Sequence, residues 1–126
     1  MVLKASLAII FSLLTFTTSA ITVSYDMVYD DASHPLQSFA CSDGKNGLLN
    51  RNFTSSGQLP TFPAIGASYK ISGWNSTSCG SCWTLTYEEK SVNFLAIDHA
   101  TTGFITSKSL MDRLTGNRAE KLGRID

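Results

Sequence analysis

Polar and apolar residues alternate along two short segments, residues 22–26 and 67–72. A period of two is typical of a strand that buries one face, so both segments are predicted to be β-strands. Residues 36–41 are a further candidate strand that leads to the first cysteine. Residues 59–66 contain two of the three prolines, which indicates irregular surface chain rather than a helix or a central strand.

A β-hairpin is predicted where two largely apolar segments, residues 84–87 and 91–97, flank the polar residues 88–90. The hairpin follows directly on residues 73–83, which hold two of the three cysteines and both tryptophans. Such a segment is expected to be a covalent and aromatic anchor. The far end of the hairpin carries Asp98.

One clear helix is predicted over residues 107–114, because three apolar side chains fall on one face at helical spacing. Ser107 and Ser109 compete as its N-cap, and Gly116 suits its C-terminus. A second short helical turn is expected at residues 117–122. Together with about five or six short strands, these elements indicate a mainly β fold, and we expect a small barrel with a helix packed on it.

The N-terminus has the pattern of a secretory signal peptide. Lys4 precedes an apolar run at residues 5–16, and residues 18–20 are small, as at a cleavage site. The alternative is a transmembrane anchor, but the run is shorter than the ~20 apolar residues that a spanning helix needs. We therefore expect a leader over residues 1–20 and one secreted domain over residues 21–126, located outside the cell or in the cell wall.

Positive and negative side chains balance, with ten Lys and Arg against ten Asp and Glu and a formal net charge of zero. The chain has no excess of positive charge of the kind that binds nucleic acid or an anionic membrane surface. We expect neither a nucleic-acid partner nor a membrane span. A neutral extracellular domain suits a partner that is held by stacking and hydrogen bonds.

The chain has three cysteines, Cys41, Cys79 and Cys82. An odd number in a secreted domain indicates an intermolecular bridge, a reactive thiol or a missing partner. The sequence Cys79-Gly80-Ser81-Cys82 is also compatible with a redox pair or half of a zinc site, but the sequence has no second pair to complete such a site. We favour structural disulfides and expect no metal and no cofactor.

Two N-glycosylation sequons begin at Asn52 and Asn75. They are accessible to glycosylation if the chain passes through a eukaryotic secretory pathway. A glycan on Asn75 would sit within residues 73–83 and mask whatever that surface binds.

These residues together resemble the cerato-platanin family, small secreted fungal proteins with a double-psi β-barrel related to expansins. The resemblance covers essentially all of residues 21–126. The motifs that carry it include Val23-Ser24-Tyr25-Asp26, Cys41-Ser42-Asp43-Gly44, Gly73-Trp74-Asn75-Ser76, Ser78-Cys79-Gly80-Ser81-Cys82-Trp83 and Leu122-Gly123-Arg124-Ile125-Asp126. It implies a mainly β protein, a double-psi β-barrel with one or two short helices.

The resemblance also implies a disulfide pattern. Members of the family have four cysteines, with the first bonded to the second and the third to a fourth near the C-terminus. Carried over to this chain, Cys41 pairs with Cys79 and Cys82 is left unpaired, because the sequence stops at Asp126 before a fourth cysteine. We therefore expect that the domain is truncated and that the last strand of the barrel is missing.

The resemblance places Asp98 in a groove where related expansins and endoglucanases carry an aspartic acid. Hydrolysis of a glycosidic bond normally takes two carboxylates, and the resemblance supplies one. Nothing in the spacing of the other aspartates marks a second catalytic residue among Asp26, Asp30, Asp31 and Asp43. We expect Asp98 to accept hydrogen bonds from a sugar, the alternative being an aspartate that only caps its own loop.

Aromatic faces stack on sugar rings, so Tyr25 and Trp74 are further candidates, although either is also compatible with the core. Trp83 is expected to be buried. The full set of carbohydrate-binding candidates is Asp98, Tyr25, Asp26, Trp74, Asn75 and Gly103.

Two functions follow from the resemblance. The first is a monomeric, non-enzymatic protein that binds chitin oligomers or cell-wall polysaccharide and acts as an elicitor of plant defence or a phytotoxic effector, with a plant receptor as a further partner. The alternative is expansin-like loosening of cellulose or chitin without hydrolysis. An endoglucanase is the least expected function.

Overall fold

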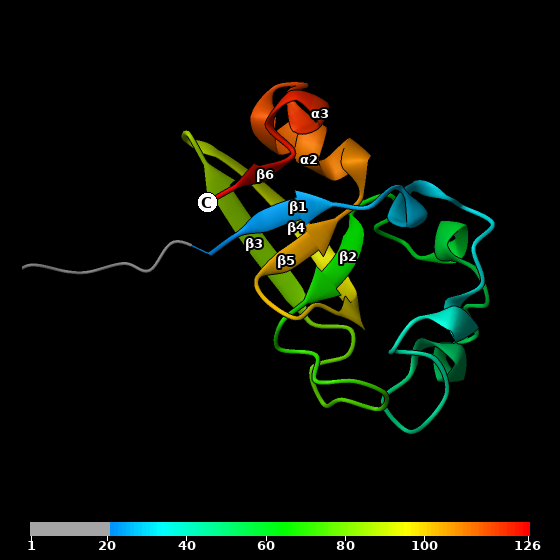
Figure 1. The fold of residues 1–126 in the computed structure, drawn as a ribbon. Helices are drawn as coiled ribbons and strands as arrows, with labels where there is room; N and C mark the ends of the chain where they lie inside the picture. Colours follow the sequence, from blue (N-terminus) through cyan, green and yellow to red (C-terminus); the bar gives the residue numbers. More distant parts are fainter. Residues whose placement is uncertain (1–20) are drawn as a thin grey trace, which may run out of the picture.

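Six strands form one curled sheet in the computed structural model, which describes residues 21–126 (Figure 1). They are β1 (Val23–Tyr25), β2 (Ile65–Ser68), β3 (Cys82–Tyr87), β4 (Lys90–His99), β5 (Phe104–Thr106) and β6 (Arg124–Ile125). Their spatial order is β3-β4-β2-β5-β1-β6. The prediction of a mainly β fold is confirmed. The double-psi crossing stays a prediction, and the predicted leader lies outside the described residues.

The hairpin is confirmed and is longer than predicted, since β3 and β4 extend to Cys82 and His99. Its turn consists of Glu88 and Glu89 alone, which both have positive φ, at 47° and 70°. Two such residues make the type of turn whose twist matches that of antiparallel strands. The paired strands carry Asp98 to the far end of the sheet, as expected.

The central strand β2 is misplaced by the sequence pattern. It begins at Ile65, inside the predicted irregular segment 59–66, and ends at Ser68, early in the predicted strand 67–72. All four of its residues are buried because β2 pairs with β4 on one side and with β5 on the other. A strand that is buried on both faces has no polar and apolar alternation to detect.

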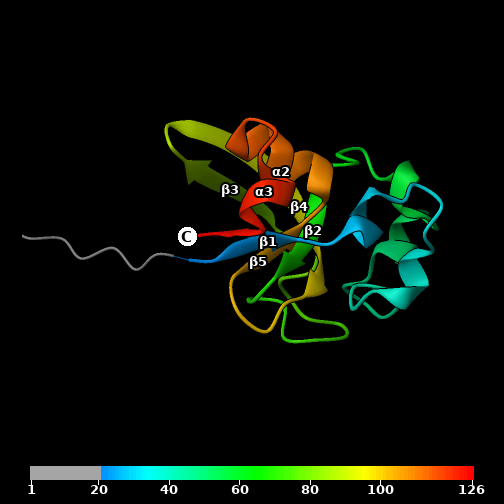
Figure 2. The ribbon, with the colours of Figure 1, turned by 45° about the horizontal axis from the view of Figure 1, so that its top comes forward.

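Four short 3₁₀-helices lie between β1 and β2 and form a lobe beside the sheet (Figures 1 and 2). They are η1 (Met27–Asp30), η2 (Leu36–Ser38), η3 (Leu48–Arg51) and η4 (Ser56–Gln58). The predicted strand at residues 36–41 is therefore wrong. Leu36 and Phe39 are both buried, and their spacing of three is one turn of a 3₁₀-helix, not the period of a strand.

The helix α2 (Lys108–Thr115) confirms the main helical prediction. Ser107 is its N-cap and accepts the N–H of Leu110 at 3.1 Å, while Gly116 ends it with a φ of 69°. Ser109, the competing N-cap, donates its hydroxyl to Asp30 instead. The second helical turn is α3 (Ala119–Leu122).

The core joins the sheet, the lobe and α2. Phe104 of β5 lies at an aromatic cluster, with ring centroids 5.0 Å from Trp83, 5.7 Å from Phe94 and 5.6 Å from Tyr69. Trp83 packs in this cluster but is only half-buried, whereas the sequence predicts a buried side chain. Within residues 21–126, the structure contains no helix long and apolar enough to span a bilayer.

The disulfide between Cys41 and Cys79 is present, as the resemblance implies. It links the 3₁₀ lobe to the loop that precedes β3. Cys82, three positions further on, is a free and exposed thiol at the first residue of β3.

Replacement of Cys41 and Cys79 by alanine should lower the free energy of unfolding by about 4 kcal/mol, because the bridge closes a loop with a sequence separation of 38. Urea unfolding followed by tryptophan fluorescence measures this loss. The matched control, Cys82→Ser, removes an unbonded thiol and should change stability by less than about 0.5 kcal/mol. A loss below about 1 kcal/mol in the double variant would show that the bridge does not constrain the unfolded chain.

Candidate functional site

A β-bulge near the end of β4 sets the direction of Asp98. In the parallel pairing with β2, the register passes from Ala96 directly to Asp98, so Ile97 has no partner in β2. An extra residue of this kind bends the strand and redirects the neighbouring side chains. The C=O of Ile97 accepts the N–H of Cys41 at 3.1 Å, so the bulge is also where the lobe meets the sheet.

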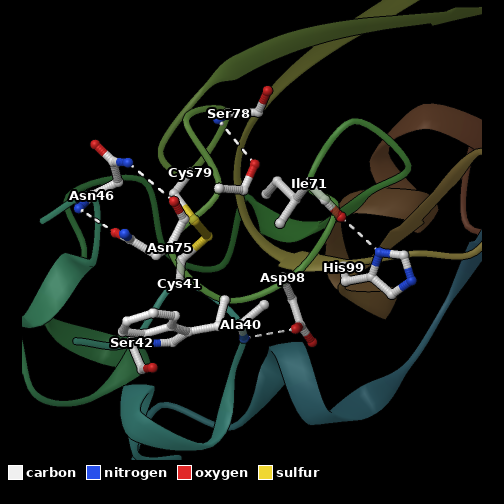
Figure 3. Close-up of a disulfide and its surroundings, with 12 residues drawn as sticks. Ala40, Cys41, Ser42, Asn46, Ile71, Asn75, Ser78, Cys79, Asp98 and His99 are labelled. Atoms are coloured by element: carbon white, nitrogen blue, oxygen red, sulfur yellow. Dashed lines mark hydrogen bonds between the residues drawn. A yellow bond between two sulfur atoms is a disulfide. The ribbon is translucent and has the colours of Figure 1, made fainter. Parts of the chain in front are cut away.

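Both carboxylate oxygens of Asp98 accept hydrogen bonds from the protein. Oδ1 accepts the backbone N–H of Ala40 at 2.9 Å (Figure 3), and Oδ2 accepts the hydroxyl of Tyr29 at 2.8 Å. Asp98 is half-buried. Because each carboxylate oxygen can accept more than one hydrogen bond, acceptor capacity remains on the exposed side of the group. Asp98 thus anchors two segments of the lobe, beyond any role toward a ligand.

The pKa of the Tyr29 hydroxyl is affected by the charges of both Asp98 and Asp26. Burial, followed by the charge of Asp98 and the hydrogen bond to it, raises the pKa of Tyr29 far above its ordinary value. The charge of Asp26 raises the pKa of Tyr29 further. Asp26 caps η1 as well, since its Oδ1 accepts the N–H of Val28 at 2.9 Å.

The other aspartates have hydrogen-bond partners elsewhere. Asp30 accepts the N–H groups of Lys108 at 2.7 Å and Ser109 at 3.0 Å, at the start of α2. Asp31 accepts the N–H and hydroxyl of Ser33, and these hydrogen bonds lower its pKa. In residues 21–126, therefore, no hydrogen bond joins Asp98 to a second carboxylate.

Trp74 is the most exposed aromatic side chain among those described, with 62% of its surface accessible. Its indole is held in place because Nε1 donates to Oδ1 of Asp43 at 2.6 Å. A Cβ on Gly44 would come within 2.9 Å of the ring, and Gly44 has a φ of 84°. The absence of a side chain at Gly44 lets the indole pack directly on the backbone, while most of the ring remains exposed to solvent.

Asn75 is locked beside this indole by Asn46. Its Oδ1 accepts the N–H of Asn46 at 2.9 Å, and its C=O accepts the Asn46 side-chain amide at 3.0 Å (Figure 3). Asn75 has a φ of 60°, a left-handed conformation that asparagine tolerates better than most residues. The polar edge of the Trp74 surface is thus fixed by side-chain hydrogen bonds rather than by a strand.

Residues 40–43 connect the two parts of the site. Ala40 donates to Asp98, and Asp43 accepts from Trp74. Three residues of chain span at most about 11 Å, so the backbones of Ala40, which holds the carboxylate, and Asp43, which holds the indole, lie within about 11 Å of each other. The disulfide at Cys41 lies within this connection.

The structure does not join Tyr25 and Gly103 to this group by hydrogen bonds. Tyr25 is half-buried at the end of β1 and packs against the core. Gly103 has a φ of 61°, and a Cβ there would lie 2.2 Å from the C=O of Thr22. Its own C=O accepts the N–H of Tyr69 at 2.9 Å. The close approach of β1 accounts for a glycine at position 103 without a ligand.

Sequence reasoning does not single out Tyr29 or Ala40 as partners of Asp98. Tyr29 is 69 positions away from it, and Ala40 contributes only a backbone N–H. No pattern in the chain signals either contact. No cluster of three or more His, Cys, Asp or Glu residues that could hold a metal occurs in the part of the chain that the structure describes.

The fold and the site define a class of small, disulfide-bonded, mainly β domain that carries an exposed indole and a half-buried carboxylate. The family model described as Cerato-platanin matches residues 21–126. The chain therefore belongs to the cerato-platanin family.

Relatives of known sequence and structure agree with this assignment. The chain is 41% identical to the heat-stable 19 kDa antigen of Coccidioides posadasii, over 98% of this chain and 84% of that protein. It is 47% identical to cerato-platanin 1 from M. perniciosa, with a TM-score of 0.82 over 85% of this chain and 90% of that one. The solution structure of the fungal elicitor Cerato-Platanin is 34% identical, with a TM-score of 0.77 over 84% and 86% of the two chains.

The hydrogen bond from Tyr29 to Asp98 predicts an alkaline dependence of stability. The pKa of Tyr29 in the folded protein lies above the ordinary value of 10.0, so its stabilising effect is full below about pH 10 and is lost as the pH rises further. Tyr29→Phe should cost about 1.5 to 3 kcal/mol at neutral pH, because a hydrogen bond to a charged group is lost. The same variant should lose less stability than the wild type at alkaline pH.

Urea unfolding between about pH 7 and pH 11 measures both effects. Tyr69→Phe is the matched control, because Tyr69 is 37% exposed and its removal should leave the alkaline loss unchanged. An identical pH dependence in the wild type and in Tyr29→Phe would contradict this account of the site.

Proposed function

We propose that this chain is a secreted, non-hydrolytic protein that binds chitin oligomers and related cell-wall polysaccharide, and that plants perceive it as an elicitor. The observation that carries the proposal is the exposed indole of Trp74, fixed by Asp43 and connected by residues 40–43 to the carboxylate of Asp98. One solved relative is named as a fungal elicitor, which supports the second part of the proposal.

The indole supplies a stacking surface. An aromatic face packs on the apolar face of a sugar ring, and an immobile ring loses less conformational entropy on binding than a free one. The hydrogen bond to Asp43 and the support by Gly44 provide that immobility. Sugar binding of this kind needs no net charge, in agreement with the neutral composition of the chain.

Polar groups around the indole supply the hydrogen bonds. Asp98 offers the remaining acceptor sites of its carboxylate to sugar hydroxyls or to the amide N–H of N-acetylglucosamine. The side-chain amides of Asn46 and Asn75 lie beside the ring and form part of the same surface. Chitin oligomers fit this arrangement because each unit carries both an apolar face and an amide.

The hydrogen bonds that several aspartates already make within the protein support binding without cleavage. Asp98 holds Tyr29 and Ala40, and Asp30 and Asp43 hold α2 and Trp74. A glycosidase needs a second free carboxyl group on the opposite side of the bond to be cut. Loosening of cellulose in an expansin-like manner is the alternative, and dispersion of filter paper without release of reducing sugar would favour it.

Titration with chitotetraose, followed by calorimetry in the wild type and in each variant, tests the proposal. Trp74→Ala should weaken binding about tenfold, equivalent to about 1.4 kcal/mol, because the stacking surface is lost. Asp98→Asn should also weaken binding, while Glu89→Gln should not. Glu89 is a matched control because it makes the same change of charge at the opposite end of β4.

The unfolding free energy of each variant separates a lost ligand contact from a loosened fold. Weaker binding by Asp98→Asn at unchanged stability would support a direct role for the carboxylate. No response of the wild type at millimolar chitotetraose, or equal affinity in Trp74→Ala, would rule out the proposed site. Release of reducing sugar that is abolished in Asp98→Asn would overturn the non-hydrolytic part of the proposal.

A further inference from the structure

Asn75 follows Trp74 directly and begins the sequence Asn75-Ser76-Thr77, the acceptor pattern for an N-linked glycan. The pattern lies in the loop between β2 and β3. Thr77, whose hydroxyl the pattern requires, is exposed. Within residues 21–126, the side-chain hydrogen bonds of this tripeptide are made by Asn75 and Ser76 and not by Thr77. The acceptor therefore lies at the surface of the folded chain.

The fold uses the side-chain oxygen of Asn75 rather than its nitrogen. Oδ1 accepts the backbone N–H of Asn46 at 2.9 Å, and the backbone C=O accepts the Asn46 side-chain amide at 3.0 Å (Figure 3). A backbone N–H can only donate, so this contact identifies the oxygen of the carboxamide. An N-linked glycan is attached to Nδ2 and leaves Oδ1 a carbonyl oxygen. Asn75 can therefore carry a glycan and keep both hydrogen bonds to Asn46.

The carboxamide of Asn75 and the indole of Trp74 lie against the same backbone. From the position that a Cβ on Gly44 would take, Oδ1 of Asn75 is 2.8 Å away and Cζ2 of the Trp74 ring is 2.9 Å away. Since the two distances add to 5.7 Å, these two atoms are at most that far apart. The nitrogen that accepts a glycan belongs to the same planar carboxamide as Oδ1. The first sugars of a glycan on Asn75 would thus begin beside the exposed ring.

The inner part of an N-linked glycan has the chemistry of chitin. The N-linked glycans of eukaryotes begin with a pair of N-acetylglucosamine units that are joined as in chitin. The core of a glycan on Asn75 is therefore a covalently attached form of the ligand that we propose for the Trp74 surface. Attachment through one side chain gives such a ligand an effective concentration on the order of millimolar or above. The core thus competes with free chitin oligomers without leaving the protein.

We propose that Asn75 carries an N-linked glycan in the secreted protein, and that the N-acetylglucosamine core of this glycan stacks on the indole of Trp74. The core then occupies the glycan-binding surface from within the same molecule. The modified form is closed to free chitin oligomers, and the unmodified form is open to them. This competition rests on the proposed function, whereas the attachment of the glycan and its packing on the indole do not.

The attachment is a glycosyl transfer from a lipid-linked oligosaccharide diphosphate. Nδ2 of Asn75 forms a bond with the anomeric carbon of the first N-acetylglucosamine, and the bond between that carbon and the diphosphate oxygen breaks. The lipid diphosphate leaves with the electron pair of the broken bond, and Nδ2 loses one proton. Nothing is oxidised or reduced, and the lipid-linked donor is the only co-reactant.

Expression of the full chain in a eukaryotic secretory host, followed by mass spectrometry of the peptide that contains Asn75, tests the modification. Thr77→Ala removes the acceptor pattern and Thr77→Ser keeps it, while neither change alters Asn75 or its hydrogen bonds. We expect the glycan in the wild type and in Thr77→Ser, and its loss in Thr77→Ala. A wild type without a glycan at Asn75 would overturn the inference and leave the proposed function standing.

NMR of the secreted proteins measures the packing of the core on the indole. An aromatic ring displaces the signals of C–H groups that lie over its face, so core N-acetylglucosamine signals of the wild type should move upfield. Trp74→Ala keeps the acceptor pattern and should abolish this displacement. Because the acceptor at Asn52 is unchanged in this variant, a glycan there contributes equally to both spectra. Undisplaced core signals in the glycosylated wild type would overturn the stacking.

Calorimetry with chitotetraose measures the competition. Thr77→Ala should bind at least about tenfold more tightly than the glycosylated wild type, and Thr77→Ser should match the wild type. Equal affinity in all three proteins would overturn the competition. Weaker binding by the glycosylated forms with undisplaced core signals would indicate steric cover alone and contradict the stacking. Displaced core signals without chitotetraose binding in any form would instead count against the proposed function and leave the packed glycan in place.

Discussion

Two consecutive backbone N–H groups hold the 3₁₀ lobe on the sheet. Ala40 donates to the carboxylate of Asp98 and Cys41 donates to the C=O of Ile97, both at the bulge of β4. The lobe contributes no strand to the six-stranded sheet, so its position depends on contacts of this kind. The disulfide from Cys41 to Cys79 reinforces the same junction covalently. The separation of the indole of Trp74 from Asp98 is fixed by these bonds together.

Because Asp98 belongs to this junction, fold and candidate site share one side chain. Its carboxylate satisfies a backbone donor and a buried phenol that would otherwise lack a partner, and unpaired buried groups of this kind are costly. These two protein donors hold the carboxylate of Asp98 in a fixed orientation. Trp74 carries no comparable structural duty, since its ring is mostly in solvent.

Elements that are stabilised by interactions between residues close in sequence can be predicted from the sequence. The hairpin and α2 are readable because their periods, their turn and the capping residue Ser107 lie within a few positions of one another. β2 is not readable, since neighbours from distant segments bury it completely. The contact of Asp98 with Tyr29 is equally hidden, because it joins residues 69 positions apart. The sequence predicts that Trp83 packs inward, but it leaves open whether Trp74 belongs to the core or to the surface, and the structure settles this through the packing around each ring.

The place of β1 in the sheet has a consequence for how the domain is made. β1 is translated at the start of the domain, yet both of its neighbours, β5 and β6, come from the end of the chain. At about 5 to 20 residues per second, roughly 4 to 16 s pass on the ribosome between Val23 and its partner Phe104. During that interval neither native neighbour of β1 has been synthesised. The native pairing of β1 can therefore form only after most of the domain has been synthesised.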